Sequence, residues 1–361
     1  MDISEINEEE LLQAVVTAIE DIPGAHVNHI NRRLSSDRHR RSDVTLDMSI
    51  AHHKVRLIIE AKREAFPRDI REFLWQLRNY DVHGAASDHD VIPFIVARSI
   101  SRGARDLLRE ESVGFCDLGG ALFIPGRSVY VMVDRPPPKR ARQVASIFEG
   151  QRARTTIILF AHRNEWVGVN ELAKLADVST ATAWSTLKEM ERHDWVDVDG
   201  SGPSKVRRLR NPKALLDEWA AYIVDQKLSK PARYYVPIPD IVRLSERLAQ
   251  ACRSNDLLYA VTSEVAAQHY APYLSTISRI HCRMVPGPVR DRVLEEIKAK
   301  RVSEGWNLAI LETRGEKDII VDHGSRAVAF APPLQVYLDL LHGSGRAKEM
   351  AAHLRKERLG A

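Results

Sequence analysis

The sequence lacks most of the features that would assign a protein to a secreted, zinc-binding or membrane class. Its 361 residues contain three cysteines, Cys116, Cys252 and Cys282, with no C-x-x-C pair among them, so neither a disulfide framework nor a zinc ribbon is expected. No apolar run approaches the roughly 18 residues of a membrane span. The N-terminal stretch MDISEINEEE is acidic, whereas a signal peptide starts basic and then turns apolar. We therefore expect a cytoplasmic protein with no membrane partner.

A glycine-rich phosphate loop, an internal repeat and a Ser-His-Asp or Cys-His set are also missing. The composition that remains is ordinary for a globular protein, with 44% hydrophobic residues, 28% charged residues and a net charge of +4. A chain of this length suits two or three domains. The distribution of charge is more informative than its sum. Five arginines and one aspartate lie between Asn31 and Arg41, and such a basic loop attracts phosphate.

The stretch from Ser42 to Tyr80 carries the strongest signal in the chain. Apolar residues occupy every second position from Val44 to Ile50 and again from Val55 to Ala61, which predicts two strands. If Ala51 to Lys54 form the loop of a hairpin, both apolar sets share one face of the sheet. A register slip by one residue would mix the two faces, so the alternation favours this hairpin.

Charged residues cluster at one end of the other face of that hairpin. The expected register places Asp43 opposite Lys62 and Thr45 opposite Glu60, with Glu60 two positions from Lys62 on the same strand. Two carboxylates can hold Mg²⁺ or Mn²⁺ through oxygen ligands, and a nearby ammonium can orient water or stabilise charge on a phosphate. The same residues also fit a structural role, with Asp43 and Lys62 as a cross-strand ion pair and Glu60 as an exposed strand residue.

A helix is expected after the second strand. Pro67 is a favoured helix-start residue, and the apolar residues from Ile70 to Leu77 recur at helical spacing. The pattern predicts a helix from Asp69 to about Val82. Gln76 and Tyr80 are four residues apart on this helix and therefore share a face.

In order and spacing, these residues resemble the PD-(D/E)xK nuclease superfamily, in its RecB-like branch with a Q-x-x-x-Y helix. The resemblance implies a restriction-endonuclease-like α/β fold. It also implies metal ligation by Asp43 and Glu60 and catalysis by Lys62. Gln76 and Tyr80 would then contact nucleic acid or complete the active site. Metal-dependent cleavage of phosphodiesters is the expected chemistry.

Two further positions bear on this resemblance. Ser42 stands where the family has the proline that gives it its name. The family also carries a glutamate on its first helix, which implies that Glu9 or Glu10 belongs to the catalytic set, because a helix is expected from Glu8 to Ile22. The same run of glutamates suits a solvated first turn that the helix dipole favours.

Strand and helix patterns alternate up to about residue 135, which places residues 1–135 in the α/β class. The run from Arg135 to Arg142 combines three prolines with basic residues. Residues 136–150 are therefore expected to form a stiff, basic linker.

Short helices replace this pattern between residues 151 and 215. They are expected from Thr155 to His162, from Val169 to Ala176, and from a cap at Ser179 through His193; two strands around the Gly200–Pro203 turn follow. This order resembles a winged helix-turn-helix domain, whose third helix enters the major groove of double-stranded DNA.

Two sets of residues in this region are candidates for DNA contact. The outward side of the third helix is expected to read base edges, and the basic wing is expected to contact phosphates. The helix set is Thr180, Thr182, Ser185 and Lys188, and the wing set is Lys205, Arg207, Arg208 and Arg210.

The region from 216 to 361 is expected to be a further α/β or α+β unit. Its stretches LYAVTSEVAAQHYAPY, PPLQVYLDLL and GRAKEMAAHLRKERL, together with the winged helix, resemble the AbiEi family of type IV antitoxins. The resemblance implies a nucleotidyltransferase-like fold in a DNA-binding autorepressor. It also implies that the protein counters a cognate toxin by acting on a target that both share, without binding the toxin tightly. Thr262-Ser263 is followed by no D-x-D pair, so transferase catalysis is not expected.

The sequence thus predicts a multidomain protein of α/β and α+β class and leaves two functions open. The first is a Mg²⁺- or Mn²⁺-dependent deoxyribonuclease targeted by its winged helix, in a defence or mobile-element context. The second is an antitoxin-like repressor whose nuclease-like domain is a scaffold or an additional DNA grip. Double-stranded DNA is the expected partner in both cases. The sequence leaves the oligomeric state open, a homodimer included.

Overall fold

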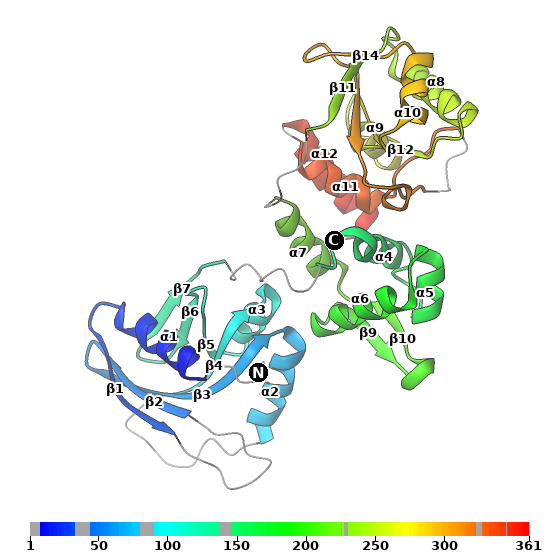
Figure 1. Cartoon of the computed structure of the whole chain (residues 1–361). Helices are drawn as coiled ribbons and strands as arrows, with labels where there is room; N and C mark the ends of the chain where they lie inside the picture. The colour runs from blue at the N-terminus through cyan, green and yellow to red at the C-terminus, as the bar shows by residue number, and fades with distance from the viewer. Residues whose placement is uncertain are drawn as a thin grey trace. The chain divides into compact units, whose positions relative to one another are not determined.

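A computed structural model describes residues 8–32, 44–79, 90–136, 146–224, 226, 230–322, 327–343 and 345–360. Within these residues the protein is of mixed α/β type, with three sheets of seven, three and five strands and twelve α-helices (Figure 1). The α/β class expected from the sequence is confirmed at this level. Asp43 and Tyr80 lie outside the described residues. No helix in the described part of the chain is long and apolar enough to cross a membrane.

The chain divides into two compact units. Unit 1 comprises Met1–Val144 with Arg192–Asp194, and unit 2 comprises Ala145–Glu191 with Trp195–Ala361. The division near residue 144 falls inside the stretch that the sequence marks as a linker.

Unit 1 is built around the seven-stranded sheet. Its elements are α1 (Glu8–Glu20), β1 (Ala25–Arg32), β2 (Val44–Ile50), β3 (His53–Ala65), α2 (Pro67–Asn79), β4 (Asp90–Ile100), α3 (Arg102–Glu110), β5 (Gly114–Asp117), β6 (Leu122–Pro125) and β7 (Tyr130–Val133). The strands lie in chain order. The pairs β3·β4 and β4·β5 are parallel and the others antiparallel.

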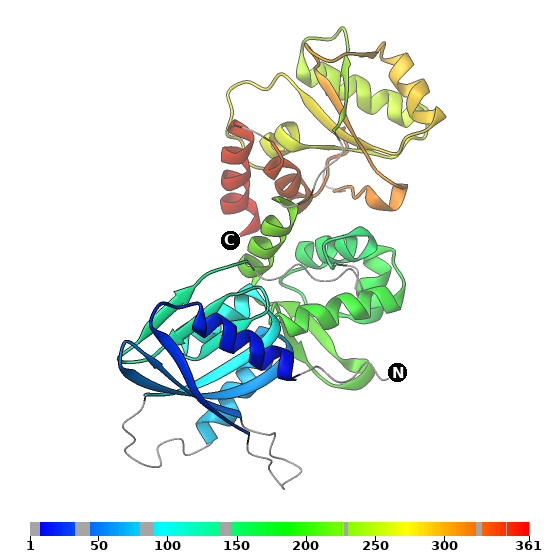
Figure 2. The same ribbon diagram turned by 60° about the vertical axis from the view of Figure 1, so that its left-hand side comes forward.

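Two apolar cores lie on the two faces of this sheet, because successive side chains of a strand point to opposite faces. Helix α1 packs on one face, where Leu11 and Val15 meet Leu46 and Leu57. Helices α2 and α3 pack on the other face against residues such as Ile95. Figure 2 shows α1 lying across its face of the sheet.

The β2–β3 hairpin has a tighter turn than the sequence suggested. Ala51 and His52 form a two-residue turn with φ of 45° and 73°, and Ile50 pairs with His53. Thr45 therefore lies opposite Ile58, and the expectation that it faces Glu60 is wrong by two residues. A shift by an even number keeps each side chain on its face, so the expected alternation of buried and outward residues is present.

Unit 2 begins with helices and a small sheet. The elements are α4 (Gly150–Ala161), β8 (Val167–Gly168), α5 (Val169–Ala176), α6 (Thr180–Arg192), β9 (Val196–Asp199), a short 3₁₀ turn (Gly202–Ser204), β10 (Val206–Leu209) and α7 (Pro212–Val224). Strand β10 lies between β8 and β9. The expected helix at Thr155 starts earlier, at Gly150, and the other expected helices and the hairpin are present within a few residues.

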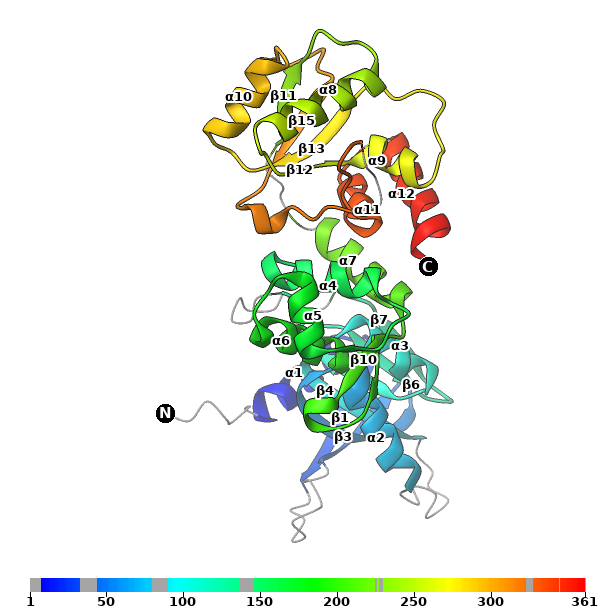
Figure 3. The same ribbon diagram turned by 90° about the vertical axis from the view of Figure 1, so that its right-hand side faces the viewer.

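The rest of unit 2 carries the five-stranded sheet, in the order β12-β13-β15-β11-β14. The elements are β11 (Ala232–Tyr235), α8 (Ile241–Ser254), β12 (Tyr259–Thr262), α9 (Ser263–Tyr270), β13 (Ile280–Met284), α10 (Pro288–Glu296), β14 (Lys300–Arg301), β15 (Leu308–Glu312), α11 (Pro333–Leu341) and α12 (Arg346–Leu354), with two short turns at Glu316–Asp318 and Arg355–Leu359. Figure 3 shows this sheet and its helices.

Candidate functional sites

Glu60 and Lys62 lie on the face of β3 that α2 covers. In the parallel β3·β4 pairing, Glu60 is opposite Ile95 and Lys62 is opposite Ala97. Ile95 and Ala97 belong to the core under α2 and α3, and paired residues point to the same face. Ile59 is the last residue of β3 with a described partner in β2, and Glu60 is the next residue.

The two side chains form an ion pair within this strand. Lys62 Nζ is 2.7 Å from Glu60 Oε1, and the side chains keep 14% and 19% of their surface exposed, respectively. Charged groups at this depth lose much of their hydration, and the attraction between them only partly offsets that loss. Both groups nevertheless retain contact with solvent. They are therefore accessible to a ligand from outside.

The other residues of the expected nuclease set are more scattered. Gln76 is exposed on α2, the helix that follows β3. Glu10 lies on α1 and therefore on the opposite side of the sheet. Its Oε2 is 3.8 Å from Nη2 of Arg98, and Arg98 directly follows Ala97, the partner of Lys62. Glu10 is thus at the same end of the sheet as Lys62, across the sheet from it.

The donor set fits a hard divalent cation only in part. Glu60 offers carboxylate oxygens, which are ligands that Mg²⁺ and Mn²⁺ accept. Within the described ranges, no three His, Cys, Asp or Glu side chains gather closely enough to hold a metal ion. Asp43, the second expected ligand, is outside those ranges.

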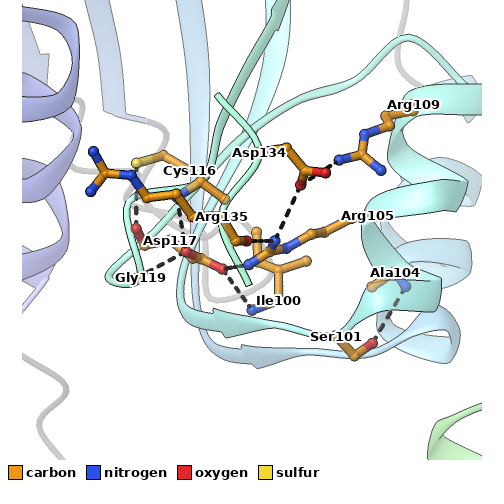
Figure 4. A network of polar contacts seen from close by, with 11 residues as sticks. Ile100, Ser101, Ala104, Arg105, Arg109, Cys116, Asp117, Gly119, Asp134 and Arg135 are labelled. Carbon is orange, nitrogen blue, oxygen red and sulfur yellow. Dashed lines mark hydrogen bonds and ion pairs between the residues drawn. The ribbon is translucent and has the colours of Figure 1, made fainter. Parts of the chain in front are cut away.

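A second ion pair in unit 1 was not foreseen from the sequence. Arg105 of α3 and Asp117 at the end of β5 are both almost fully buried, and Nη2 of Arg105 binds Oδ2 of Asp117. Asp117 Oδ1 also accepts hydrogen bonds from the backbone N–H of Gly119 at 3.0 Å and of Ala121 at 3.3 Å, and Oδ2 accepts one from Ile100 at 3.4 Å. Figure 4 shows these contacts around the Asp117 carboxylate.

Arg105 extends the network toward the end of the domain. Its Nη1 donates to the carbonyl oxygen of Arg135, and Arg109 on the next helical turn binds Asp134 at 3.1 Å (Figure 4). These contacts fasten the residues after β7 to α3. The Gly119-Gly120 turn after Asp117 was the available signal, because a carboxylate before such a turn can accept its backbone N–H groups.

In unit 2, α6 presents the residues expected to read DNA. Thr180 and Lys188 are exposed, and Thr182 and Ser185 are partly buried. Ser179 caps the helix as expected, since its Oγ accepts the backbone N–H of Thr182 at 3.1 Å. The Thr182 and Ser179 hydroxyl oxygens are 2.8 Å apart, and Ser185 Oγ donates to the carbonyl oxygen of Thr182 at 3.0 Å. The hydroxyls of Thr182 and Ser185 are thus already engaged within the helix.

An aromatic residue dominates the same outward side of α6. Trp184 is 49% exposed, and Nζ of Lys188 lies 4.9 Å from the centre of its ring. A cation over an indole face is attracted by the ring quadrupole. Trp184 was not among the residues that the sequence proposed for DNA contact.

The wing residues differ sharply in their surroundings. Arg207 is buried, and Glu191 of α6 binds it at 2.8 Å and Lys205 at 2.8 Å. Burial alone would raise the pKa of the Glu191 carboxyl, but the hydrogen bonds from Lys205 and Arg207 outweigh burial and hold that pKa below its ordinary value. Arg207 therefore joins β10 to α6 and has little surface left for a phosphate.

The remaining wing arginines are more open. Arg208 is 3.2 Å and Arg210 is 3.8 Å from Asp197 of β9, with close to half of each side chain exposed. Arg208 also lies over the ring of Trp166, 4.7 Å from its centre. Exposed pairs of this kind exchange partners at little cost, so both arginines remain available to phosphate.

In the C-terminal part, a buried carboxylate joins α11 to the sheet. Asp339 binds Arg283 of β13, accepts a hydrogen bond from Thr262 Oγ1, and accepts another from Gln335 at 3.0 Å. The network holds α11 against β12 and β13. Burial works to lower the pKa of Arg283, but the Asp339 carboxylate outweighs it and the pKa lies above its ordinary value.

Comparisons of the chain with protein-family models, curated proteins and solved structures found no match.

Proposed function

We propose that the protein is a DNA-binding, divalent-metal-dependent nuclease, with cleavage in unit 1 and DNA recognition by a winged helix-turn-helix at the start of unit 2. The observation that supports cleavage most directly is the Glu60–Lys62 pair. An apolar pair of similar size at these positions would avoid the desolvation cost, so a partly buried acid beside an ammonium favours a functional reason for both.

The chemistry follows from what each group can do. A bound Mg²⁺ or Mn²⁺ would supply a Lewis acid and an activated water. Glu60, with Asp43, is the oxygen donor that would hold it. Lys62 places a positive charge beside that carboxylate, where it stabilises charge on a phosphate oxygen or orients the attacking water. Lys62 Nζ, 2.7 Å from Glu60 Oε1, would keep its positive charge next to a metal held by that carboxylate.

Recognition would come from α6 and the wing. The engaged hydroxyls of Thr182 and Ser185 leave Lys188, Trp184 and the exposed Thr180 as the side chains that extend furthest from the helix. Lys188 can bond to base edges or phosphates, and Arg208 and Arg210 can bond to phosphates. In this proposal, α6 supplies the sequence preference, and the wing supplies sequence-independent binding to phosphates.

The decisive experiment is a cleavage assay with the full chain, Mg²⁺ or Mn²⁺, and linear, supercoiled and branched DNA. Lys62→Ala should lower the rate by about 10²-fold or more, as loss of a charge stabiliser commonly does. Arg56→Ala is the matched control. Arg56 is a cation on the same face of the same strand, and it pairs with Asp47 at 2.6 Å rather than with Glu60. The control should cleave at nearly the wild-type rate.

Absence of metal-dependent cleavage by the wild type on all three substrates would remove the nuclease proposal. Sequence-specific DNA binding without cleavage would instead support the second candidate, an AbiEi-like antitoxin and autorepressor. One observation favours that candidate for the C-terminal part. His281 and Arg283, which pair with Thr262 and Ala260 of β12, offer no carboxylate to hold the metal ions of a phosphoryl transferase.

A further inference from the structure

The five-stranded sheet of unit 2 has two unlike faces. Side chains of directly paired residues share a face, and the pairings form a row from Thr262 through His281 and Ala309 to Arg233. One strand further, Tyr235 pairs with Lys300, and it lies on the same face as Arg233 because the two are two residues apart.

Helices α8 and α10 pack on the opposite face of this sheet. Cys282 and Tyr234 point to that face and are buried against α8 and α10, and Arg290 of α10 binds Glu312 there. On the first face, α9 and α11 cover only β12 and β13, where Asp339 holds Thr262 and Arg283. Among the described residues, no helix makes close contact with β15, β11 or β14 on this face.

An unusual group of cations lies on this uncovered part. The guanidinium carbons of Arg279 and Arg233 are 4.4 Å and 5.3 Å from the centre of the Trp306 ring, and both arginines are exposed. Neither has a carboxylate within ion-pair distance among the described residues. The wing arginines, by contrast, all pair with acids. Stacking on an indole fixes a guanidinium plane and leaves its in-plane N–H groups for an anion.

Further aromatic and basic side chains lie next to these arginines. Tyr235 is 45% exposed, and Lys300 beside it is exposed as well. His281 meets the edge of the Trp306 ring, with the two ring centres 5.4 Å apart. A carboxylate also approaches this face, since Glu264 lies 3.0 Å from Nδ1 of His281. Burial works to raise the pKa of Glu264, but His281 and, less strongly, the charge of Arg279 hold that pKa below its ordinary value. Glu264 is within ion-pair distance of the histidine and not of Arg279.

We propose that this surface, formed by Arg233, Tyr235, Arg279, Lys300 and Trp306, binds single-stranded nucleic acid. The arginines and Lys300 would neutralise phosphates, and the exposed ring of Tyr235 would stack on a base. Bases in a duplex are already stacked on one another, whereas those of a single strand can lie flat on an open sheet. The site is separate from the duplex-reading helix α6 and does not depend on the nuclease proposal.

The test measures binding of the full chain to labelled oligonucleotides of thymidine and of uridine, with a chelator present so that no cleavage occurs. Arg233→Ala/Arg279→Ala should weaken binding about tenfold or more and should lower the salt slope by about 0.7 per lost phosphate contact. The matched control is Arg292→Ala/Arg301→Ala. Both of these arginines are exposed, Arg292 on α10 and Arg301 opposite Tyr234, which faces the covered side.

A second variant keeps the test independent of packing around Trp306. Tyr235→Ala removes an exposed ring and should weaken binding by about five- to 100-fold while leaving the thermal unfolding temperature unchanged. Equal losses in the control and the Arg233/Arg279 variant would overturn the proposal, as would full binding by Tyr235→Ala. A preference for the uridine or the thymidine oligonucleotide would identify the natural strand as RNA or DNA.

Discussion

Two ion pairs in unit 1 contain the same kinds of groups and teach opposite lessons. The Arg105–Asp117 pair is almost completely buried, and both carboxylate oxygens of Asp117 accept further hydrogen bonds. The Glu60–Lys62 pair is partly exposed, and both of its members belong to one strand. A closed pair that links three segments stabilises the fold. A pair that stays open to solvent remains accessible to a ligand.

The largest expected effect is on the closed pair. Asp117→Ala leaves the buried Arg105 guanidinium without its carboxylate and should lower the free energy of unfolding of unit 1 by about 3–5 kcal/mol. Denaturant titration would measure it. Asp134→Ala is the matched control, because Asp134 also binds an arginine of α3 but is 64% exposed, and its loss should cost under about 1 kcal/mol. Equal losses in the two variants would contradict the distinction.

Loss of the Glu60–Lys62 pair should affect cleavage more than stability. Lys62→Ala should cost less unfolding free energy than Asp117→Ala, because water can reach the Glu60 carboxylate once the ammonium is gone. Its cleavage rate should still fall by about 10²-fold. Denaturant titration and a cleavage assay on the same preparation of Lys62→Ala would measure both quantities. A loss of stability as large as that of Asp117→Ala would place Glu60–Lys62 with the structural pairs.

The Arg207–Glu191 pair extends the comparison to unit 2. It is somewhat more exposed than the Arg105 pair, and Glu191 also binds Lys205, so Arg207→Ala should lower unfolding free energy by about 1.5–3 kcal/mol near neutral pH. The pKa of Glu191 is depressed in the folded protein, so this contribution is present above the ordinary carboxyl pKa and is lost as pH falls through the folded value. Unfolding curves of both proteins across this acid range should converge. A pH-independent difference would indicate that Arg207 acts through packing alone.

The smallest effect is expected for the exposed wing pairs. Arg208→Ala/Arg210→Ala should change stability by under about 1 kcal/mol. It should reduce the salt dependence of duplex binding by about two phosphate contacts, with similar losses for all sequences. Arg207→Ala should leave that slope unchanged, provided that its fold is retained at the temperature of the assay. The opposite assignment of slopes would mean that the buried arginine reaches DNA in the complex.

The sequence predicted the elements of the β2–β3 hairpin but not its register. Period-two alternation defines which residues share a face, and any even shift preserves it. The turn decides the rest. Two-residue turns with positive φ favour Asn and Gly, and Ala51-His52 gives no such signal, so a longer loop was the natural expectation.

For the candidate sites too, local sequence patterns predicted which residues share a face but not which residues they contact in other elements. Spacing indicated that Glu60 and Lys62 share a face, because that depends on neighbours along one strand. It could not distinguish Arg207 from Arg208, since both are basic residues of one strand. Burial of Arg207 depends on Glu191, a contact between β10 and α6 that no local pattern encodes. The Arg105–Asp117 contact was missed for the same reason, although the Gly119-Gly120 turn was a local signal for the hydrogen bonds that Asp117 accepts.

The three buried cysteines make the transient opening of each unit measurable by thiol labelling. All three are buried, and burial raises the pKa of Cys116 and of Cys252 to about 12 and raises that of Cys282 well above its ordinary value. Thiol reagents attack the thiolate, so near neutral pH they should modify these residues only while the surrounding core is transiently open. Labelling kinetics followed by peptide mass would then time the opening of unit 1 through Cys116 and of unit 2 through Cys252 and Cys282, in a single unmodified chain.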